Sequence, residues 1–284
     1  MGELLNSLQD ALQQNQQLLV GTLILARVAS MITMTPFFGS KAAPFEVKMG
    51  LSIGLTLLVY QFAFDAARAY GPIPISPIPF LLLMLKEVFI GVTLGFVITK
   101  IFWAMEVAGR LIDTVRGASM AEVMVPQSGS RATPFGDMLY QLLIVFFMAL
   151  GGHRWFIEYF ALSFEKLPLN YALQLSDNAM VPFFEHIIRL TAELVMLGVL
   201  VATPIVAATF ISDVVFGILN RVAPQLNAYF MSMPVKAIAG IIMMFILLEP
   251  LAVRIEDYVV WQLKEVETTL DLINFARESG GPAP

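Results

Sequence analysis

The sequence predicts an all-α, polytopic protein of the membrane type, and three observations support this fold class. Its 284 residues are 58% hydrophobic and only 14% charged. The mean hydropathy is +0.77. The apolar residues gather into blocks that are too long for the strands of a soluble core and that suit membrane-spanning helices. One polytopic unit therefore explains the chain better than one or two soluble domains.

Six apolar blocks define the expected helices, because a membrane-spanning helix needs about 17 to 25 residues. The fourth block is too short to cross a membrane alone. The fifth is too long for one straight helix and contains Pro204, which lacks a backbone donor and is expected to kink the helix. In chain order the blocks are residues 18–38, 49–64, 78–103, 138–150, 187–216 and 237–253.

Proline and glycine cluster in three connections, which are expected to be the breaks between helical hairpins. Two pairs of glycines lie inside the apolar blocks, Gly50 with Gly54 and Gly91 with Gly95. Each pair places small residues on one helical face and would let another backbone approach closely. The three connections are residues 35–44, 71–79 and 116–136.

Seven charged side chains lie inside or at the ends of the apolar blocks. A lipid-facing charge costs about 2.5 to 3.5 kcal/mol at the bilayer centre, so these side chains are expected to meet partners or a hydrated interior. A spacing of four residues makes Glu106 with Arg110, and Arg189 with Glu193, candidate pairs on single helices. Contact with other subunits is the alternative. The seven are Arg27, Lys86, Glu87, Lys100, Arg189, Glu193 and Asp213.

The chain is expected to end in an amphipathic helix. Residues 1–253 form the main helical domain, residues 254–279 carry an apolar stripe between acidic residues, and residues 280–284 are expected to be a disordered tail. The stripe would pack on its own chain or lie at an interface, and docking onto a partner is the alternative. Its members are Ile255, Val259, Leu263, Val266, Leu270 and Ile273.

Charge, cysteine and motif content exclude several classes of function. The net charge is −5 and the sequence has no cluster of Lys and Arg, so nucleic acid is not an expected partner. It has no cysteine, and its two histidines, His153 and His186, show no metal-ligand spacing. No nucleophile elbow supports Ser163 with His153 as a catalytic pair, and no phosphate-binding loop occurs. The chain is expected not to be an enzyme and to need no cofactor or metal.

Two further predictions concern a signal peptide and the orientation of the chain in the membrane. Residues 1–17 are polar and acidic, and they lack the basic region and cleavage pattern of a signal peptide. If six spans are assumed, Lys and Arg divide almost evenly between the two sets of loops, so the sequence indicates no orientation in the membrane.

Three motifs, in this order, carry a family resemblance. Residues 112–119 read Ile-Asp-Thr-Val-Arg-Gly-Ala-Ser. Gly151, Gly152 and His153 precede a Ser-Phe pair and Pro168. Residues 220–227 read Asn-Arg-Val-Ala-Pro-Gln-Leu-Asn, and Met-Pro-Val-Lys follows at 233–236. Together they resemble the SctT/FliR family, and the third motif is closer to injectisome SctT than to flagellar FliR. The resemblance covers most of the chain except the tail.

This resemblance implies a core export-gate subunit of a bacterial type III protein secretion system. Family members fold as kinked helical hairpins, as though an SctR-like and an SctS-like chain were fused, and assemble into a helical pore complex. The implied partners are about five SctR-like and about four SctS-like subunits, an SctU-like switch protein, inner rod and needle components, and unfolded effector proteins as substrates. The implied location is the bacterial inner membrane, with much of the chain above the bilayer plane.

The resemblance also implies site residues. The loop from Arg116 to Gly136 matches the family segment that plugs the channel at rest, and a solvated surface loop is the alternative. Gly151, Gly152 and His153 are expected to mark the bend of a helical hairpin, with no chemistry. The plug residues are Arg116, Gly117, Ala118, Ser119, Met120, Met124, Pro126 and Gly129.

The polar segment between the last two apolar blocks is expected to be non-helical and to pack against subunits or line the pore. Its prolines are expected to shape a turn, and plain capping and turn-making is the alternative. Its residues are Asn220, Arg221, Pro224, Gln225, Asn227, Pro234 and Lys236.

Two other functions stay open. Flagellar export is one. The other is an ion-coupled transporter whose ion path would use Lys86, Glu87, Arg189 and Glu193, although the inverted repeat that favours such a fold is not evident in the sequence.

Overall fold

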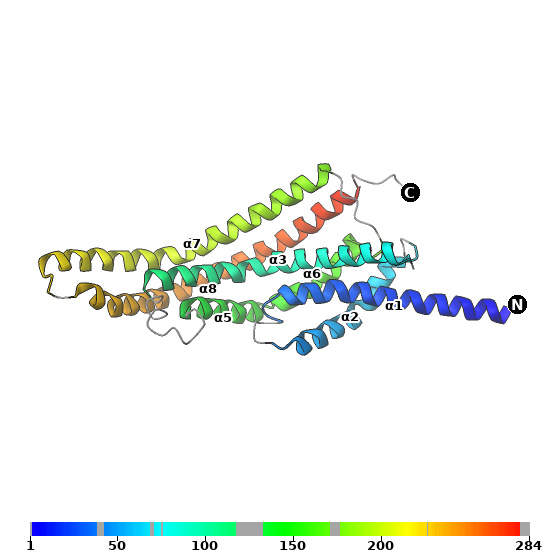
Figure 1. Ribbon diagram of the computed structural model, residues 1–284, viewed down its shortest axis with the longest axis horizontal. Helices are drawn as coiled ribbons and strands as arrows, with labels where there is room; N and C mark the ends of the chain where they lie inside the picture. The colour runs from blue at the N-terminus through cyan, green and yellow to red at the C-terminus, as the bar shows by residue number, and fades with distance from the viewer. Residues whose placement is uncertain are drawn as a thin grey trace. The chain divides into compact units, whose positions relative to one another are not determined.

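A computed structural model describes residues 2–38, 43–68, 71–74, 76–117, 133–170, 177–225 and 227–278. All regular elements in these ranges are helices, which confirms the predicted all-α class. They are α1 (Gly2–Met34), α2 (Phe45–Arg68), α3 (Pro77–Val115), α5 (Pro134–Ala149), α6 (Gly152–Lys166), α7 (Asp177–Val222) and α8 (Ala228–Glu278) (Figure 1).

The helices end where proline and glycine cluster in the sequence. The connection from Thr35 to Pro44 separates α1 from α2, and α3 begins at Pro77 after Gly71, whose φ is +89°. Gly117 follows the end of α3 with φ +82° and donates its N–H to Thr114 O at 3.1 Å. A glycine in the left-handed region ends a helix without the steric cost that a side chain would add.

Within the described residues, five helices are long and apolar enough to cross a membrane, and a broken pair could make a sixth span. The five spans lie in α1, α2, α3, α7 and α8. The pair is α5 and α6, which are separated by residues 150–151. The prediction that the fourth apolar block cannot cross alone is confirmed, because α5 has only 16 residues.

The last two helices are longer than the sequence suggested. Pro204 lies within α7, a continuous helix of 46 residues. The predicted terminal amphipathic segment is helical, and it continues α8, which runs without a break through residue 254 and has 51 residues. Pro234 and Pro250 both lie inside α8. Proline is tolerated inside membrane helices when neighbouring groups satisfy the freed carbonyl. Residues 279–284, including the predicted tail, lie outside the described residues.

The chain divides into two compact units. Unit 1 comprises Met1–Thr99, Gly152–Ile188 and Trp261–Pro284, and unit 2 comprises Lys100–Gly151 and Arg189–Val260. Helices α3, α7 and α8 each contribute residues to both units.

In unit 1, α1 packs along α2, and α2 also contacts α6 (Figure 1). The glycines of α3 face α1: a Cβ placed on Gly91 would lie 2.4 Å from Arg27 O, and one on Gly95 would lie 2.7 Å from the Met34 Cβ. This confirms a close helix approach at the second glycine pair. A Cβ on Gly50 or Gly54 would meet nothing within 4 Å, so the first pair makes no such approach within the described residues.

The C-terminal part of α8 packs on its own chain. Val266, Leu270 and Ile273 are buried, as an apolar stripe facing a core requires. His186 Nε2 lies 2.8 Å from Thr269 Oγ1, and Lys166 Nζ forms an ion pair with Asp271 at 2.5 Å. The prediction that this apolar stripe packs on its own chain is therefore confirmed for these residues.

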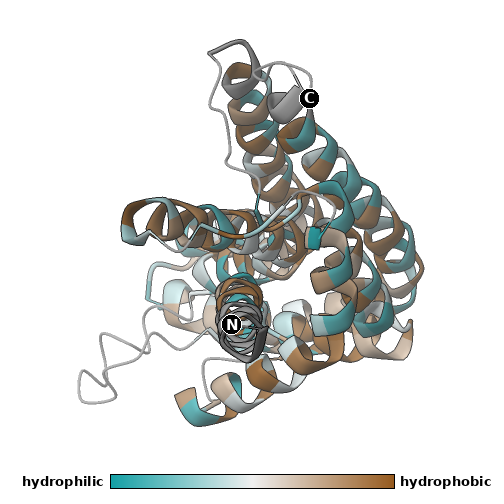
Figure 2. Cartoon of the chain, turned by 90° about the vertical axis from the view of Figure 1, so that its right-hand side faces the viewer, coloured by the Kyte–Doolittle hydropathy of each residue, from teal (hydrophilic) through white to brown (hydrophobic). Residues whose placement is uncertain are grey.

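In unit 2, aromatic rings and small residues hold α3 against α5 and α7. The Phe102 ring packs edge-on against Phe147, with centroids 5.5 Å apart. A Cβ on Gly198 of α7 would lie 2.9 Å from Ala104 O. Much of the apolar surface of α7 and α8 is exposed, and brown, hydrophobic residues recur along the helical ribbons in Figure 2.

Candidate functional site

The polar segment at 220–236 forms the turn between α7 and α8. The structure corrects its predicted backbone: α7 extends to Val222 and α8 begins at Ala228, so of the described residues only 223–225 and 227 are non-helical. Ala223 N–H donates to Leu219 O at 2.8 Å, and Met231 N–H donates to Asn227 O at 3.3 Å. The connection is therefore short, and its first and last residues each continue the backbone bonding of the adjoining helix.

The predicted site residues of this segment divide into an exposed and a buried set. Pro224 lies in the turn as expected, whereas Pro234 lies inside α8, so its assignment to the turn was wrong. Lys236 is 9% exposed, which makes it the buried member. The exposed members are Asn220, Arg221, Pro224, Gln225, Asn227 and Pro234.

Lys236 forms an ion pair with Asp213 that joins α8 to α7 in unit 2. The ammonium-bearing side chain is 11% exposed, and the carboxylate-bearing side chain is 45% exposed. The sequence reasoning named both residues without pairing them. The signal was available, because the two positions lie almost equally far before and after the turn, and such positions face each other in an antiparallel helical hairpin.

The base of the loop at 116–136 is held by Asp113, which sequence reasoning quoted in a motif but did not select. Its Oδ2 accepts the backbone N–H groups of Phe135 at 3.0 Å and Gly136 at 3.4 Å. These are orphan donors at the N-terminus of α5, whose own N-cap residue, Thr133, makes no side-chain bond. The Asp113 carboxylate thus caps α5 from α3, where its charge also suits the helix dipole.

Arg116 also stabilises the base of the loop at 116–136. Its guanidinium lies 4.0 Å from the Phe135 ring centroid, 3.7 Å from Asp113 Oδ1, and donates to Ala237 O at 3.3 Å. A Cβ on Gly240 would lie 2.7 Å from Arg116 Nε, so glycine leaves room for this side chain on α8. Burial lowers the pKa of Arg116 from its ordinary value, and Asp113 opposes that shift.

Of the residues predicted to form the plug, Arg116 and Gly117 lie at this base. The others lie outside the described residues: Ala118, Ser119, Met120, Met124, Pro126 and Gly129.

Gly151, Gly152 and His153 lie where the chain breaks between α5 and α6. Gly151 has φ +79° and donates its N–H to Met148 O at 3.1 Å, which ends α5. Gly152 is buried and opens α6, followed by the half-buried His153. The motif therefore forms a helix break, and its role as the bend of a helical hairpin stays a prediction.

Residues after this motif, together with α1 and α3, form a buried charge cluster in unit 1. Arg27 and Glu87 are both 0% exposed, and Arg27 Nε donates to Glu87 Oε2 at 2.5 Å. The same guanidinium donates to Ser163 O at 2.9 Å, to Ser163 Oγ at 3.1 Å and to Leu167 O at 2.8 Å. It also lies 4.2 Å from the Phe164 ring centroid.

Lys86 completes this cluster. Its Nζ lies 2.7 Å from Glu87 Oε1 and donates to Pro168 O at 2.8 Å and Leu169 O at 3.0 Å. Two cations therefore bind carbonyls at and after the C-terminal end of α6, where a helix lacks partners for its last carbonyls and favours positive charge.

The predicted charge pairs on single helices are confirmed. Arg110 Nη2 lies 2.5 Å from Glu106 Oε1, and Arg189 Nε lies 3.8 Å from Glu193 Oε1. Lys100 also reaches Glu193, at 3.5 Å. In the described part of the chain, no group of three or more His, Asp and Glu side chains could hold a metal ion.

Comparison with known proteins places this arrangement in a family. The model of "Bacterial export proteins, family 1" matches residues 18–260, which contain the turn, the loop base, the helix break and the charge cluster. The chain belongs to the bacterial export proteins, family 1.

Relatives of this export protein occur in two kinds of system. It is 30% identical to the Yop proteins translocation protein T of Yersinia pestis over 227 residues, which cover 80% of this chain and 85% of the relative. It is also 30% identical to the flagellar biosynthetic protein FliR of Pectobacterium carotovorum over 222 residues, covering 78% and 81%. The surface presentation of antigens protein SpaR of Salmonella typhimurium is 27% identical over 227 residues, covering 79% and 81%.

These relatives confirm the resemblance to the SctT/FliR family that the three motifs indicated. The export protein is all-helical with five or six candidate spans among its described residues, consistent with a multi-pass membrane protein.

Proposed function

We propose that this chain is a core export-gate subunit of a bacterial type III protein secretion system. It would join SctR and SctS homologues in a channel for unfolded effector proteins, in the inner membrane, with much of the chain above the bilayer plane. An SctU-like switch protein and the inner rod and needle components would be neighbours. Family membership and the names of the relatives support export as the process. Energy would come from other subunits, because the sequence offers no nucleotide-binding motif.

The observation that carries this proposal is the surface of α7 and α8 in unit 2. Large apolar side chains are exposed along both helices, among them Phe210, Ile211 and Phe245 at 63, 63 and 70%. Lipid alone does not suit this surface, since the Asp213 side chain stays 45% exposed among these residues even with Lys236 as its ion-pair partner, and an exposed charge is costly in hydrocarbon. Protein neighbours beside a hydrated channel would satisfy both the apolar side chains and the charge.

We propose the injectisome rather than the flagellum. The identities do not separate the two, because the Yop translocation protein and the flagellar protein are each 30% identical to this chain. The preference rests on the third motif, where Asn220 and Arg221 precede the Pro-Gln-Leu-Asn core. Both polar side chains are exposed at the end of α7, where they could contact a neighbouring subunit.

The loop from Arg116 to Gly136 is proposed as the plug of the channel. Asp113 and Arg116 fix the two ends of this loop. A plug that moves within a channel needs such fixed ends. Deletion of residues 119–130 should raise ion leak through the assembled complex, while a deletion variant with unchanged conductance would remove the plug from the proposal. Replacement of those residues by a Gly-Ser segment of equal length is the matched control for loop length.

Native mass spectrometry of the affinity-tagged chain, expressed from its own operon and extracted in mild detergent, tests the proposed function. A complex that contains one copy of this chain and several copies of two small hydrophobic subunits is the expected result. A lone monomer or a homodimer would contradict it and favour the transporter alternative. Arg221→Ala should weaken recovery of those subunits, with exposed Arg254→Ala as the control.

A further inference from the structure

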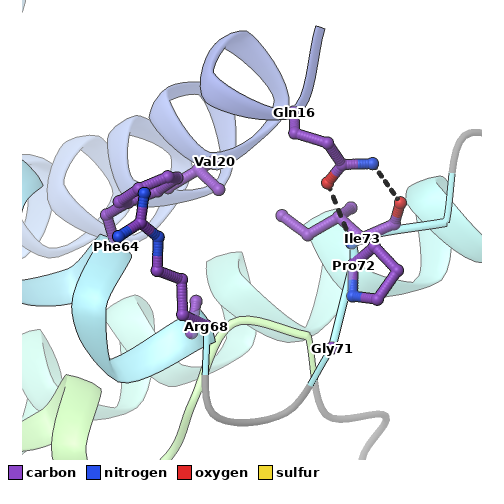
Figure 3. Close-up of a pocket in the computed structure, with 8 residues that line it drawn as sticks. Gln16, Val20, Phe64, Arg68, Gly71, Pro72 and Ile73 are labelled. Atoms are coloured by element: carbon purple, nitrogen blue, oxygen red, sulfur yellow. Dashed lines mark hydrogen bonds between the residues drawn. The ribbon is translucent and has the colours of Figure 1, made fainter. Parts of the chain in front are cut away.

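A cavity of about 290 Å³ lies in unit 1 between α1, the end of α2 and the chain at residues 71–73 (Figure 3). Its walls are mainly apolar. Val20 and Ile73 are each 3% exposed, and the Phe64 ring forms a third wall. A volume of this size is at the lower end for small-molecule sites and suits part of a flexible ligand, not a whole large one.

Among the described residues that line this cavity, two side chains carry large polar groups, and one of them already makes hydrogen bonds. Gln16 Nε2 donates to Ile73 O at 2.9 Å, while its Oε1 accepts the Ile73 N–H at 2.9 Å (Figure 3). The other is Arg68, whose side chain is 68% exposed. A ligand in the cavity would therefore find apolar contact inside and one cation at the mouth.

The Arg68 guanidinium is held in place without losing its donors. It lies 4.4 Å from the Phe64 ring centroid, and the Phe64 ring stacks on Tyr60 with centroids 5.7 Å apart. Its ion pair with Asp65 is 4.0 Å long and exposed on both sides, which makes that pair weak. A stacked guanidinium is weakly hydrated and presents its planar donors to phosphate.

The cavity lies at the end of two candidate membrane spans. In α1 the apolar block begins at residue 18, after the polar residues 1–17, and the span in α2 ends at Arg68. Aromatic side chains with a polar tip and arginines are typical of this level of a membrane protein, because one end is in lipid and the other in water. Closer to the start of α2, Leu57, Leu58 and Phe62 are exposed and would face acyl chains.

We propose that this cavity binds an anionic phospholipid. The phosphate accepts hydrogen bonds from Arg68, and the first part of one acyl chain lies against Val20, Phe64 and Ile73. Charge complementarity and the position at two span ends select a lipid over a soluble anion. The inference stands on unit 1 alone and does not depend on the secretion role.

The test is native mass spectrometry of the full chain, with any subunits that copurify, after delipidation and incubation with phosphatidylglycerol or phosphatidylcholine. Wild-type protein should retain phosphatidylglycerol about fivefold more than Arg68→Gln does, which is the effect of one cation near an anionic head group. Arg68→Lys should keep part of the binding. Arg254→Gln, which replaces an exposed arginine on α8 and not on α2, should retain phosphatidylglycerol as the wild type does.

Equal retention of phosphatidylglycerol by the wild type and Arg68→Gln would overturn the proposal. Equal retention of the two lipids by the wild type would overturn the assignment of an anionic head group. Displacement of the lipid by millimolar inorganic phosphate alone would overturn the choice of a lipid, because it would mean that the cavity does not bind the acyl chain. Loss of a protein subunit from the Arg68→Gln preparation would assign the cavity to a protein partner instead.

Discussion

Replacement of Arg27 by methionine removes the centre of the buried charge cluster of unit 1. Methionine keeps an unbranched side chain but has no donor. Glu87, which is 0% exposed, would lose its bond of 2.5 Å and keep only Lys86. Two carbonyls, Ser163 O and Leu167 O, would lose donors at 2.9 and 2.8 Å. The contact of 4.2 Å with the Phe164 ring would also lose its cation.

The cost of this change follows from the burial of the pair. Removal of one partner from a buried ion pair costs about 3 to 5 kcal/mol, because the remaining charge stays desolvated. Each kcal/mol lowers the Tm of a domain of this size class by about 2 to 4 °C. The expected loss for Arg27→Met is therefore roughly 6 to 20 °C, as the product of these two ranges.

The control is Arg110→Met. Arg110 also lies 2.5 Å from a carboxylate, that of Glu106, but its side chain is 54% exposed. Exposed pairs are worth about 0.2 to 1 kcal/mol, so this variant should melt within about 4 °C of the wild type. The assay heats the detergent-solubilised protein, with any subunits that copurify, and follows the loss of the monodisperse peak in gel filtration.

Equal melting of Arg27→Met and Arg110→Met would refute the reasoning, because it would mean that burial of the cluster has no energetic consequence. Arg27→Lys should fall between the wild type and Arg27→Met. A lysine ammonium could reach Glu87, but it lacks the planar set of donors that bonds several acceptors in different directions.

Three further predictions use the same assay. Gly91→Ala should cost about 1 to 3 kcal/mol through overpacking, because its Cβ would lie 2.0 Å from a side-chain oxygen of α1, whereas Gly54→Ala, with nothing within 4 Å, should not destabilise. Asp113→Ala should cost about 0.5 to 2 kcal/mol through the lost cap of α5, and Asp113→Asn should recover most of it, since Asn also caps helices; equal losses would exclude the capping role. Asp213→Asn should destabilise more than Lys236→Met, because the former leaves a buried ammonium unpaired and the latter leaves a carboxylate that is 45% exposed; the reverse order would contradict the assigned burial.

Local features were predictable from the sequence because their causes are local. The helix breaks follow from proline and from glycines such as Gly117 and Gly151, whose positive φ angles other residues rarely adopt. The pair of Glu106 and Arg110 follows from helical spacing alone. The same local reasoning placed too much of the segment at 220–236 in a turn, because Pro234 lies inside α8 and does not end it.

The partners of the buried charges were not predictable in the same way. Arg27 meets Glu87 60 residues later and Ser163 136 residues later, and both contacts depend on how α1, α3 and α6 pack. Asp113 was overlooked for a related reason. Its role depends on the missing side-chain cap at Thr133, which a sequence with a threonine before Pro134 does not reveal.

The placement of polar groups suggests which part of the chain makes assembly contacts. Contact with other subunits was the alternative predicted for the charges in the apolar blocks, but Arg27, Lys86 and Glu87 have ion-pair partners inside unit 1. Buried groups that already have partners are poor candidates for an interface. In unit 2, by contrast, Arg221 is exposed beside the exposed apolar side chains of α7 and α8. Variants of Arg221 should therefore act on assembly, and variants of Arg27 on the stability of the chain itself, so the two kinds of defect can be separated experimentally.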